Sequence, residues 1–362
     1  MRLWPTLLSR TIIRGNILLL VPTLLLGIGL YLLTDLFEKL DNFLEAQVPL
    51  AVMATYFVVK IPLVVSQILP VIFLLSVVIQ LCLMARNREL TALQAGGISL
   101  AVPARVLILC GVLCAGAQLG FSEVLGVAGE RESSRIWAEE VRKRDLSSAV
   151  FKDVWFTDRH WIVSLGTLRP GNKGEGFVGY ELVPREQKLL RIVQAKTYAG
   201  EPGNWQLYSV TEYMPAQYST RELPSLTLPL EQDPGTFRLF TRDTTPSQLP
   251  IWQLSSVIER LSSSGSNVEK LRTVWHTKVA YAASLVVMAL IAVALVSWNS
   301  NIYLATCLSL MCTFLYYAAF TISTSLGQRG VIPPPLAAWG ANIVAAALAG
   351  IRLVPLFFQR RF

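Results

Sequence analysis

The strongest constraint in this sequence is a set of long stretches that contain no charged residue. Measured from one charge to the next, they are residues 15–34, 61–85, 106–122, 279–328 and 330–351. About 20 consecutive apolar residues are enough for a helix to cross the hydrocarbon core of a bilayer. The stretch 279–328 is too long for one crossing, and the polar run Ser297–Asn301 divides it into two. The sequence therefore predicts six transmembrane helices.

The composition agrees with a membrane protein. Of the 362 residues, 53% are hydrophobic and 15% are charged, whereas soluble domains average about 25% charged residues. The cysteines all lie in apolar blocks, where we expect small packing residues rather than disulfides of an exported domain. They are Cys82, Cys110, Cys114, Cys307 and Cys312. The first apolar block follows Arg10 and Arg14 and has no small-residue cleavage site, so we expect an anchor and not a cleaved signal peptide.

The positions of the arginines predict the orientation, because Lys and Arg that flank a span are retained in the cytoplasm. With six spans, three arginine groups fall on one side: Arg2, Arg10 and Arg14; Arg86 and Arg88; Arg360 and Arg361. The acid-rich connection between the first two spans belongs on the other side. We therefore predict cytoplasmic termini and an outer region from about Glu123 to Lys278, which in a bacterium lies in the periplasm beyond the inner membrane. The net charge of +8 then reflects topology, and we expect no nucleic-acid partner.

The outer region has the pattern of a compact β domain. It contains short apolar and aromatic runs at 149–156, 161–165, 177–182, 189–195, 205–210 and 237–240. Turn-forming residues separate many of them, at Arg169–Asn172, Pro184 and Gly200–Asn204, which is typical of an antiparallel β sandwich or barrel. The flanking segments 123–144 and 250–272 are expected to be helical.

These observations predict a polytopic α-helical membrane protein with six transmembrane helices and a periplasmic antiparallel β domain between helices 3 and 4. We expect helices 1 to 3 in residues 1–128, the β domain with its helical linkers in residues 129–272, and helices 4 to 6 in residues 273–362. A short cytoplasmic helix is expected at about residues 86–97, within the first of these parts.

Enzyme chemistry is not indicated. The closest fragment to a nucleotide-binding loop, Gly166–Lys173, lacks the Gly-Lys-Ser/Thr ending, so this chain is not expected to hydrolyse ATP. His160 and His276 stand in no metal-ligand or nucleophile motif, and we expect no catalytic residue and no metal. The spans carry almost no ionisable group, which disfavours coupling to an ion gradient. If the protein transports something, a partner must supply the energy.

The segment Arg86–Gly97 is the best candidate for a docking surface. Asn87 is suited to cap a short helix and Gly96-Gly97 to stop it. Leu90 and Leu93 are three residues apart and share a face, with Glu89 beside them. Two interpretations stay open at this point: a coupling helix that inserts into a cleft of an ATPase, or an interfacial helix that lies on lipid headgroups.

Charged residues also cluster at the predicted outer rim of the membrane. Asp35 and Lys39 end the first span, and Arg131 and Arg135 follow the third. Cations at this height would suit the phosphates of an anionic lipid. The alternative is a solvated rim without a ligand.

The segment Val77–Ser99 resembles the coupling-helix pattern of the LptF/LptG family, the permease subunits of the bacterial lipopolysaccharide ABC exporter. The matching residues are Met84-Ala85-Arg86-Asn87-Arg88-Glu89-Leu90 and Gln94-Ala95-Gly96-Gly97. The stretches Ile61–Pro70 and Gly330–Pro335 are also similar to family patterns, and the order of spans and insert agrees over nearly the whole chain. The resemblance implies that Arg88, Glu89, Leu90, Leu93, Gly96 and Gly97 couple the permease to an ATPase.

The resemblance also implies partners and a mechanism. The insert is expected to be a β-jellyroll, and the chain to pair with its homologue, with an LptB-type ATPase dimer that uses ATP, and with LptC through its transmembrane helix and jellyroll. The complex would extract lipopolysaccharide from the inner membrane and pass it to a periplasmic bridge, and this chain would bind no cofactor itself.

Within the family, Thr34–Leu40 and the short basic tail are more similar to LptG than to LptF. LptG tends to carry lysines where Leu32 and Glu38 stand here, so Asp35 and Lys39 are the matching residues. The alternatives are an LptF paralogue in the same complex and a membrane-tethered periplasmic scaffold without transport activity.

Overall fold

The computed structural model describes residues 7–142, 151–169, 171–182, 188–201, 203–231, 246–263 and 267–358. The chain divides into two compact units. The first contains Met1–Ser133 and Glu269–Phe362, and the second contains Ser134–Val268. Each unit is described by itself.

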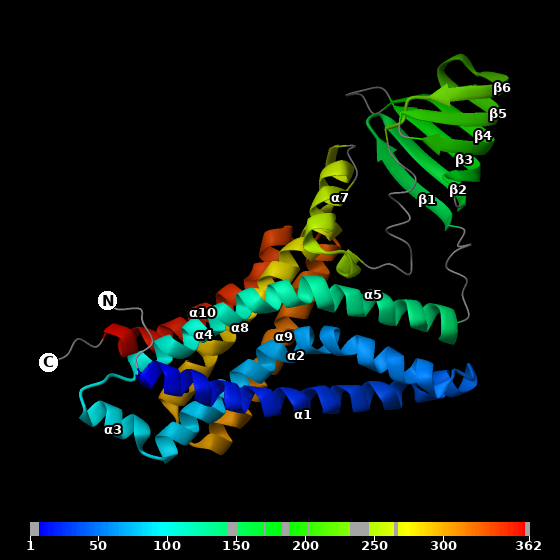
Figure 1. The fold of residues 1–362 in the computed structure, drawn as a ribbon. Coiled ribbons are helices and arrows are strands. Elements are labelled where there is room, and N and C mark those ends of the chain that lie inside the picture. The colour runs from blue at the N-terminus through cyan, green and yellow to red at the C-terminus, as the bar shows by residue number, and fades with distance from the viewer. Residues whose placement is uncertain are drawn as a thin grey trace. The chain divides into compact units, whose positions relative to one another are not determined.

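The first unit is a helical bundle (Figure 1). Its helices are α1 (Leu7–Glu45), α2 (Leu50–Arg86), α3 (Glu89–Ala95), α4 (Ala101–Phe121), α8 (Glu269–Trp298), α9 (Ile302–Gln328) and α10 (Pro334–Phe358). Helix α4 continues without a break through the π-helical turn η1 (Ser122–Gly126), α5 (Val127–Ile136) and a second π-helical turn, η2 (Trp137–Val141). Six of the described helices are long and apolar enough to cross a membrane, which confirms the predicted number of spans.

The break between the fourth and fifth spans lies where the polar run predicts it. Helix α8 ends at Trp298, and the side chain of Asn301 accepts hydrogen bonds from the backbone N–H groups of Tyr303 and Leu304 at the start of α9. This is the usual way in which an asparagine satisfies the free N–H groups of a first helical turn. A short polar segment is therefore enough to separate two spans.

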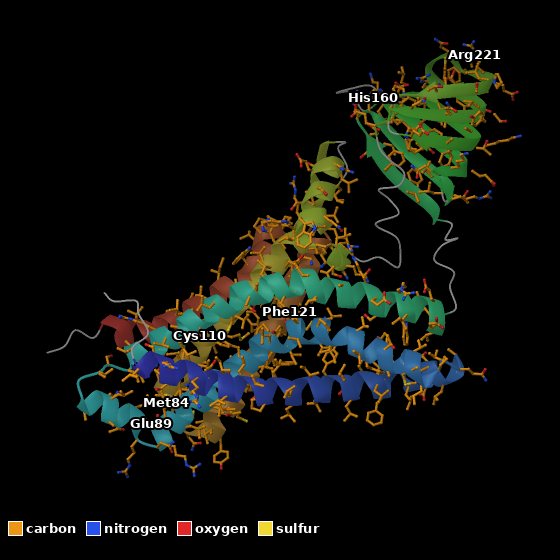
Figure 2. The ribbon with its side chains drawn as sticks, in the orientation of Figure 1. Met84, Glu89, Cys110, Phe121, His160 and Arg221 are labelled. Carbon is orange, nitrogen blue, oxygen red and sulfur yellow. The ribbon has the colours of Figure 1, made fainter. Side chains whose placement is uncertain are left out.

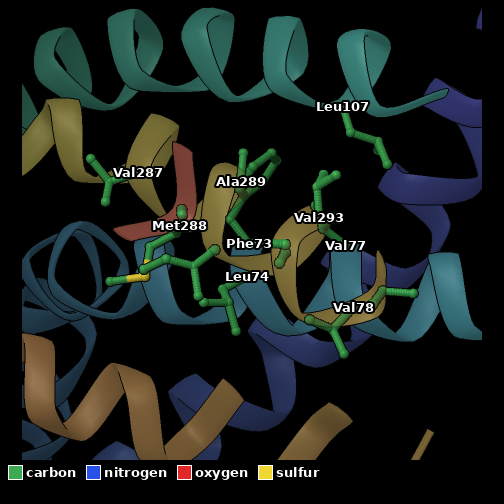
Figure 3. Packing of buried hydrophobic residues seen from close by; sticks show 14 of the residues in the cluster. Phe73, Leu74, Val77, Val78, Leu107, Val287, Met288, Ala289 and Val293 are labelled. Atoms are coloured by element: carbon green, nitrogen blue, oxygen red, sulfur yellow. The ribbon is translucent and has the colours of Figure 1, made fainter. Parts of the chain in front are cut away.

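The centre of the bundle is formed by α2 and α8. Figure 3 shows Phe73, Leu74 and Val77 of α2 in one apolar cluster with Met288 of α8 and Leu107 of α4, all of them fully buried. Helix α1, in contrast, exposes many large apolar side chains, as expected of a helix that faces lipid or another subunit.

A close contact at Gly327 gives a testable consequence for stability. A Cβ atom added there would lie 2.3 Å from the Cβ of Ala337 and 3.0 Å from Cγ2 of Thr273, so α9 packs closely against its neighbours at this point. We expect Gly327→Ala to destabilise the bundle by about 1–3 kcal/mol, as overpacking does in other cores. Thermal unfolding of the purified chain in detergent measures this. Gly350→Ala is the matched control, because no atom lies within 4 Å of the Cβ position at Gly350; equal effects of both substitutions would contradict the assignment.

The second unit contains an antiparallel sheet. Its strands are β1 (Phe151–Asp158), β2 (Trp161–Arg169), β3 (Lys173–Leu182), β4 (Leu189–Glu201), β5 (Asn204–Met214) and β6 (Ser219–Leu228). Each described strand pairs with the next one along the chain. This confirms an antiparallel β domain between the third and fourth spans. The order is that of a meander, so the crossing connections of a jellyroll would have to lie outside the described strands.

Five of the six predicted β runs are strands, and the sixth, Phe237–Phe240, lies outside the described residues. Inside the sheet, Trp205 stacks on Tyr198 at a ring distance of 5.7 Å, and the Tyr198 hydroxyl donates to the carbonyl of Thr167 at 2.8 Å. Burying a tyrosine is favourable only when its hydroxyl finds such a partner.

The helical flanks predicted on both sides of the β domain are also present. The helix before it reaches Val141, and the one after it is α7 (Ile251–Ser263), followed by the first turns of α8. Two short 3₁₀ turns, η3 (Pro215–Gln217) and η4 (Pro246–Gln248), complete the unit. Gln248 of η4 donates to Ser134 Oγ at 3.0 Å, which ties the two flanks together.

Candidate functional site

The first candidate site is the short helix α3, which joins α2 to α4. Figure 2 labels Glu89 at its first residue and Met84 near the end of α2. The prediction that Asn87 caps α3 is wrong. Arg88 occupies the capping position with a left-handed backbone (φ 58°), and no side chain caps the helix. The reason is that Asn87 is the C-cap residue of α2, and its N–H donates to the carbonyl of Leu83 at 2.9 Å.

The predicted stop of α3 at Gly96-Gly97 is confirmed. Gly97 has a positive φ of 76°, and the N–H of Ile98 reaches back to the carbonyl of Leu93 at 2.8 Å. A glycine adopts this left-handed conformation without the steric cost that a Cβ atom would add. The two glycines therefore turn the chain sharply from α3 toward α4.

The structure separates the predicted coupling residues into two groups. Leu90 and Leu93 are partly buried and pack against the apolar core of the bundle. Leu90 also lines a space of about 240 Å³, together with Ala104 of α4 and Val293 of α8. Arg88 and Glu89 are exposed, as are Gly96 and Gly97. The leucines thus anchor α3 to its own bundle, and the charged residues are the ones presented outward.

The second candidate site is an ion cluster between α1 and α2. The carboxylate of Asp35 accepts hydrogen bonds from Lys60 Nζ at 2.8 Å through both oxygens, and Lys39 Nζ lies 3.0 Å from Oδ1. Asp35 and Lys60 are each 8% exposed. Two ammonium groups therefore share one carboxylate, and the charges of these three residues sum to +1.

Tyrosines complete this cluster. Lys39 Nζ donates to the hydroxyl of Tyr56 at 2.5 Å, and Lys60 Nζ lies 5.4 Å from the centre of the Tyr56 ring and 5.8 Å from that of Tyr31. Cation–π contacts of this kind stabilise an ammonium group that is shielded from water. The side chain of Lys39 is 22% exposed and that of Lys60 is 9% exposed. Lys39 is therefore the cation of the cluster that faces outward.

The sequence indicated Asp35 and Lys39 but not Lys60 and Tyr56. In the sequence, Lys60 is only the charge that precedes the uncharged stretch 61–85, and Tyr56 belongs to no recognisable motif. Their positions relative to the two spans do indicate them. Lys60 and Tyr56 lie as many residues before the second span as Asp35 and Lys39 lie after the first. Antiparallel helices of a hairpin bring such positions to the same height.

The predicted residues Arg131 and Arg135 lie on α5, not on the α1–α2 hairpin. Arg131 is exposed, and Arg135 pairs with Glu139 one turn later at 2.7 Å. The side chains of that pair are 52% and 36% exposed. An exposed pair at this spacing contributes little to stability.

A buried ion pair within the bundle escaped the sequence analysis. Lys278 Nζ of α8 lies 2.8 Å from Oε1 of Glu123, in the π-helical turn that follows α4, and the two side chains are 13% and 5% exposed. Both residues were seen only as the charged borders of uncharged stretches. Their contact joins the start of the fourth span to the end of the third.

His160, labelled in Figure 2, belongs to a row of polar contacts across the sheet. Its Nε2 lies 3.1 Å from Glu181, whose other carboxylate oxygen accepts from Arg191 Nε at 2.5 Å. Arg191 also donates to Glu212 at 2.8 Å. Such cross-strand pairs stabilise neighbouring strands, which is a structural role for His160.

The comparison with known families decides the identity. A family model described as "Lipopolysaccharide export system permease LptF/LptG" matches residues 10–354, which is nearly the whole chain. The chain belongs to the LptF/LptG family. No curated protein matches it.

Membership of the LptF/LptG family fits the architecture. A family of lipopolysaccharide export permeases consists of transport subunits rather than enzymes, and six apolar helices are those of a multi-pass inner-membrane protein. The match does not separate LptF from LptG. It extends across both the helical bundle and the β unit, so both parts of the chain belong to the transporter.

Proposed function

We propose that this chain is the LptG-type permease of a lipopolysaccharide ABC exporter, which extracts lipopolysaccharide from the inner membrane and passes it to a periplasmic bridge. The observation that carries the proposal is the family match over residues 10–354. The choice of LptG rests on the sequence from Thr34 to Leu40. The proposed partners are LptF, an LptB-type ATPase dimer that hydrolyses ATP, and LptC.

Helix α3 is the proposed coupling element. Arg88 and Glu89 would contact the ATPase, while Leu90 and Leu93 hold the helix against the bundle. Because short connections join α3 to α2 and to α4, and because Leu90 shares a space with Val293 of α8, a displacement of α3 would be transmitted to all three helices. The cytoplasmic position of α3 and of both termini is part of this proposal.

The Asp35 cluster is the proposed contact for the lipid phosphates. In the proposed orientation, the end of the α1–α2 hairpin that carries it lies on the periplasmic side, where lipopolysaccharide is anchored. Asp35 and Tyr56 would hold Lys39 in place, and Lys39 would offer its ammonium group to a phosphate. Arg131 and Arg135 are proposed as further cations at the rim.

We expect Lys39→Glu to reduce lipopolysaccharide contact at this cluster several-fold, because the substitution replaces an ammonium group with a repelling carboxylate. The measurement is photocrosslinking from a reactive residue placed at Thr34, which is exposed about 1.4 turns before Lys39 on α1. Lys39→Arg is the matched control, since it keeps the charge. Unchanged crosslinking in Lys39→Glu would remove Lys39 from the site.

Purification of the tagged chain from its native membrane, followed by mass spectrometry of proteins and lipids, tests the proposed function. We expect a second permease, an ATPase and lipopolysaccharide in the sample. A second permease of the LptG type would assign this chain to LptF. A lone chain with bulk phospholipid, found in more than one detergent, would favour the tethered scaffold instead.

A further inference from the structure

An apolar groove runs along one side of the bundle, between α8, α9 and α10. Its volume is about 790 Å³. Small residues of α10, among them Gly340, Ala341 and Ala345, line it. Its other lining residues include Leu315, Val344 and Leu348, which are 57%, 60% and 66% exposed. The groove is therefore bordered by side chains that face hydrocarbon.

One end of the groove carries polar groups. Arg352 and Trp298 line it there, both exposed, in a groove that is otherwise almost entirely apolar. Among the described residues, the guanidinium of Arg352 donates one long hydrogen bond, 3.4 Å, to the carbonyl of Ser297, and a guanidinium has five N–H donors. Arginine and tryptophan are the residues found at the level of lipid headgroups.

The charged end lies at the same end of the bundle as α3. Ser297, which accepts the bond from Arg352, also lines the space beneath Leu90 and Gln94 of α3. In the orientation proposed above this is the cytoplasmic side, opposite to the leaflet of the proposed cargo.

The length of the groove matches one lipid chain. From Gly340 to Arg352, α10 rises by about 18 Å at 1.5 Å per residue. One leaflet of the hydrocarbon core is about 15 Å deep, half of the ~30 Å total. A chain that starts at Arg352 would therefore follow the groove through its own leaflet and end near Gly340.

We propose that this groove binds one anionic phospholipid of the cytoplasmic leaflet, with its phosphate on Arg352 and an acyl chain along α9 and α10. The charge at one end favours this occupant over a transmembrane helix of a partner, because an apolar helix would bring no anion to the guanidinium. Only the choice of leaflet rests on the proposed orientation, and the phospholipid site does not depend on the transport of lipopolysaccharide.

The test is a titration of the purified complex, in detergent, with phosphatidylglycerol and separately with phosphatidylcholine, read by native mass spectrometry. We expect phosphatidylglycerol to bind preferentially, and Arg352→Gln to weaken its binding about fivefold, the effect of one cation at a membrane surface. Arg329→Gln is the matched control, because Arg329 is an exposed arginine at the other end of α9. Ala345→Phe should block the groove, whereas Ala347→Phe, on an exposed position of the same helix outside the groove, should not.

Each result decides the proposal. If Arg352→Gln and Arg329→Gln weakened the binding of phosphatidylglycerol equally, the lipid would be attracted by the overall charge of the protein, and the proposal would be wrong. Equal binding of phosphatidylglycerol and phosphatidylcholine would also overturn the proposal. A phosphatidylglycerol with a photoreactive acyl chain gives a test on the unsubstituted chain. Crosslinks should fall on 312–323 and 340–349, and crosslinks of these residues to a partner protein in place of lipid would assign the groove to a helix.

Discussion

Glu89→Arg is expected to abolish lipopolysaccharide export while the protein still inserts in the membrane. Glu89 is exposed at the first turn of α3, and its neighbours Leu90 and Leu93 are engaged with the bundle. The substitution therefore reverses a charge on the outward face and leaves the anchor intact. Losing one partner of a charge pair at an interface costs about 2–5 kcal/mol, so we expect the affinity for the ATPase to fall at least about 30-fold.

Co-purification of the ATPase and lipopolysaccharide release from membrane vesicles measure the two effects of Glu89→Arg. Glu89→Gln keeps the size of the side chain and is expected to give an intermediate loss. Glu259→Arg is the matched control, since it makes the same charge change on an exposed position of α7. If Glu89→Arg retained both ATPase association and export, α3 would lose its proposed role and the interfacial interpretation would stand.

The behaviour of α3 illustrates what sequence patterns reveal and what they leave open. The glycine pair predicted the end of the helix, because few other residues adopt the left-handed backbone that Gly97 has. The spacing of Leu90 and Leu93 showed that they share a face, but spacing carries no information on what that face contacts. Both leucines pack against the apolar core of the bundle, and Leu90 shares a space with residues of α2, α4 and α8, which only the fold brings together.

The spans were predictable because an apolar helix in lipid is a local property of the sequence. The ends of the helices were not predictable from the same pattern. Helix α1 has 39 residues, or about 58 Å at 1.5 Å per residue, and so extends well past the uncharged stretch 15–34. Charged residues end a hydrophobic stretch without ending a helix, which is why Lys60 and Glu123 were read as borders and not as members of buried ion pairs.

Strand β6 was missed for a different reason. It is mostly exposed, contains Pro224, and reads as a polar segment. Among the described strands it pairs with β5 alone, and at such an edge proline and charged residues are tolerated. The inner strands, in contrast, carry the apolar residues that gave the β prediction.

The other large effect is expected from Asp35→Ala. This substitution leaves the ammonium group of Lys60 without its carboxylate at a site where Lys60 is 8% exposed. Removing one partner of a buried pair costs about 3–5 kcal/mol, and we expect a corresponding fall in the unfolding free energy of the purified chain in detergent. Arg135→Ala is the matched control: it removes one member of an exposed pair, and its effect should stay below about 1 kcal/mol.

The double substitution Asp35→Ala, Lys60→Met separates the charge from the packing. It removes the unpaired ammonium group and keeps a long apolar side chain, so stability should recover in large part. Export should stay impaired, because Lys39 has lost its ion pair with Asp35, in which Nζ lies 3.0 Å from Oδ1. A double variant as unstable as Asp35→Ala would place the cost in packing, and one that exports normally would show that the cluster stabilises the hairpin without binding the cargo.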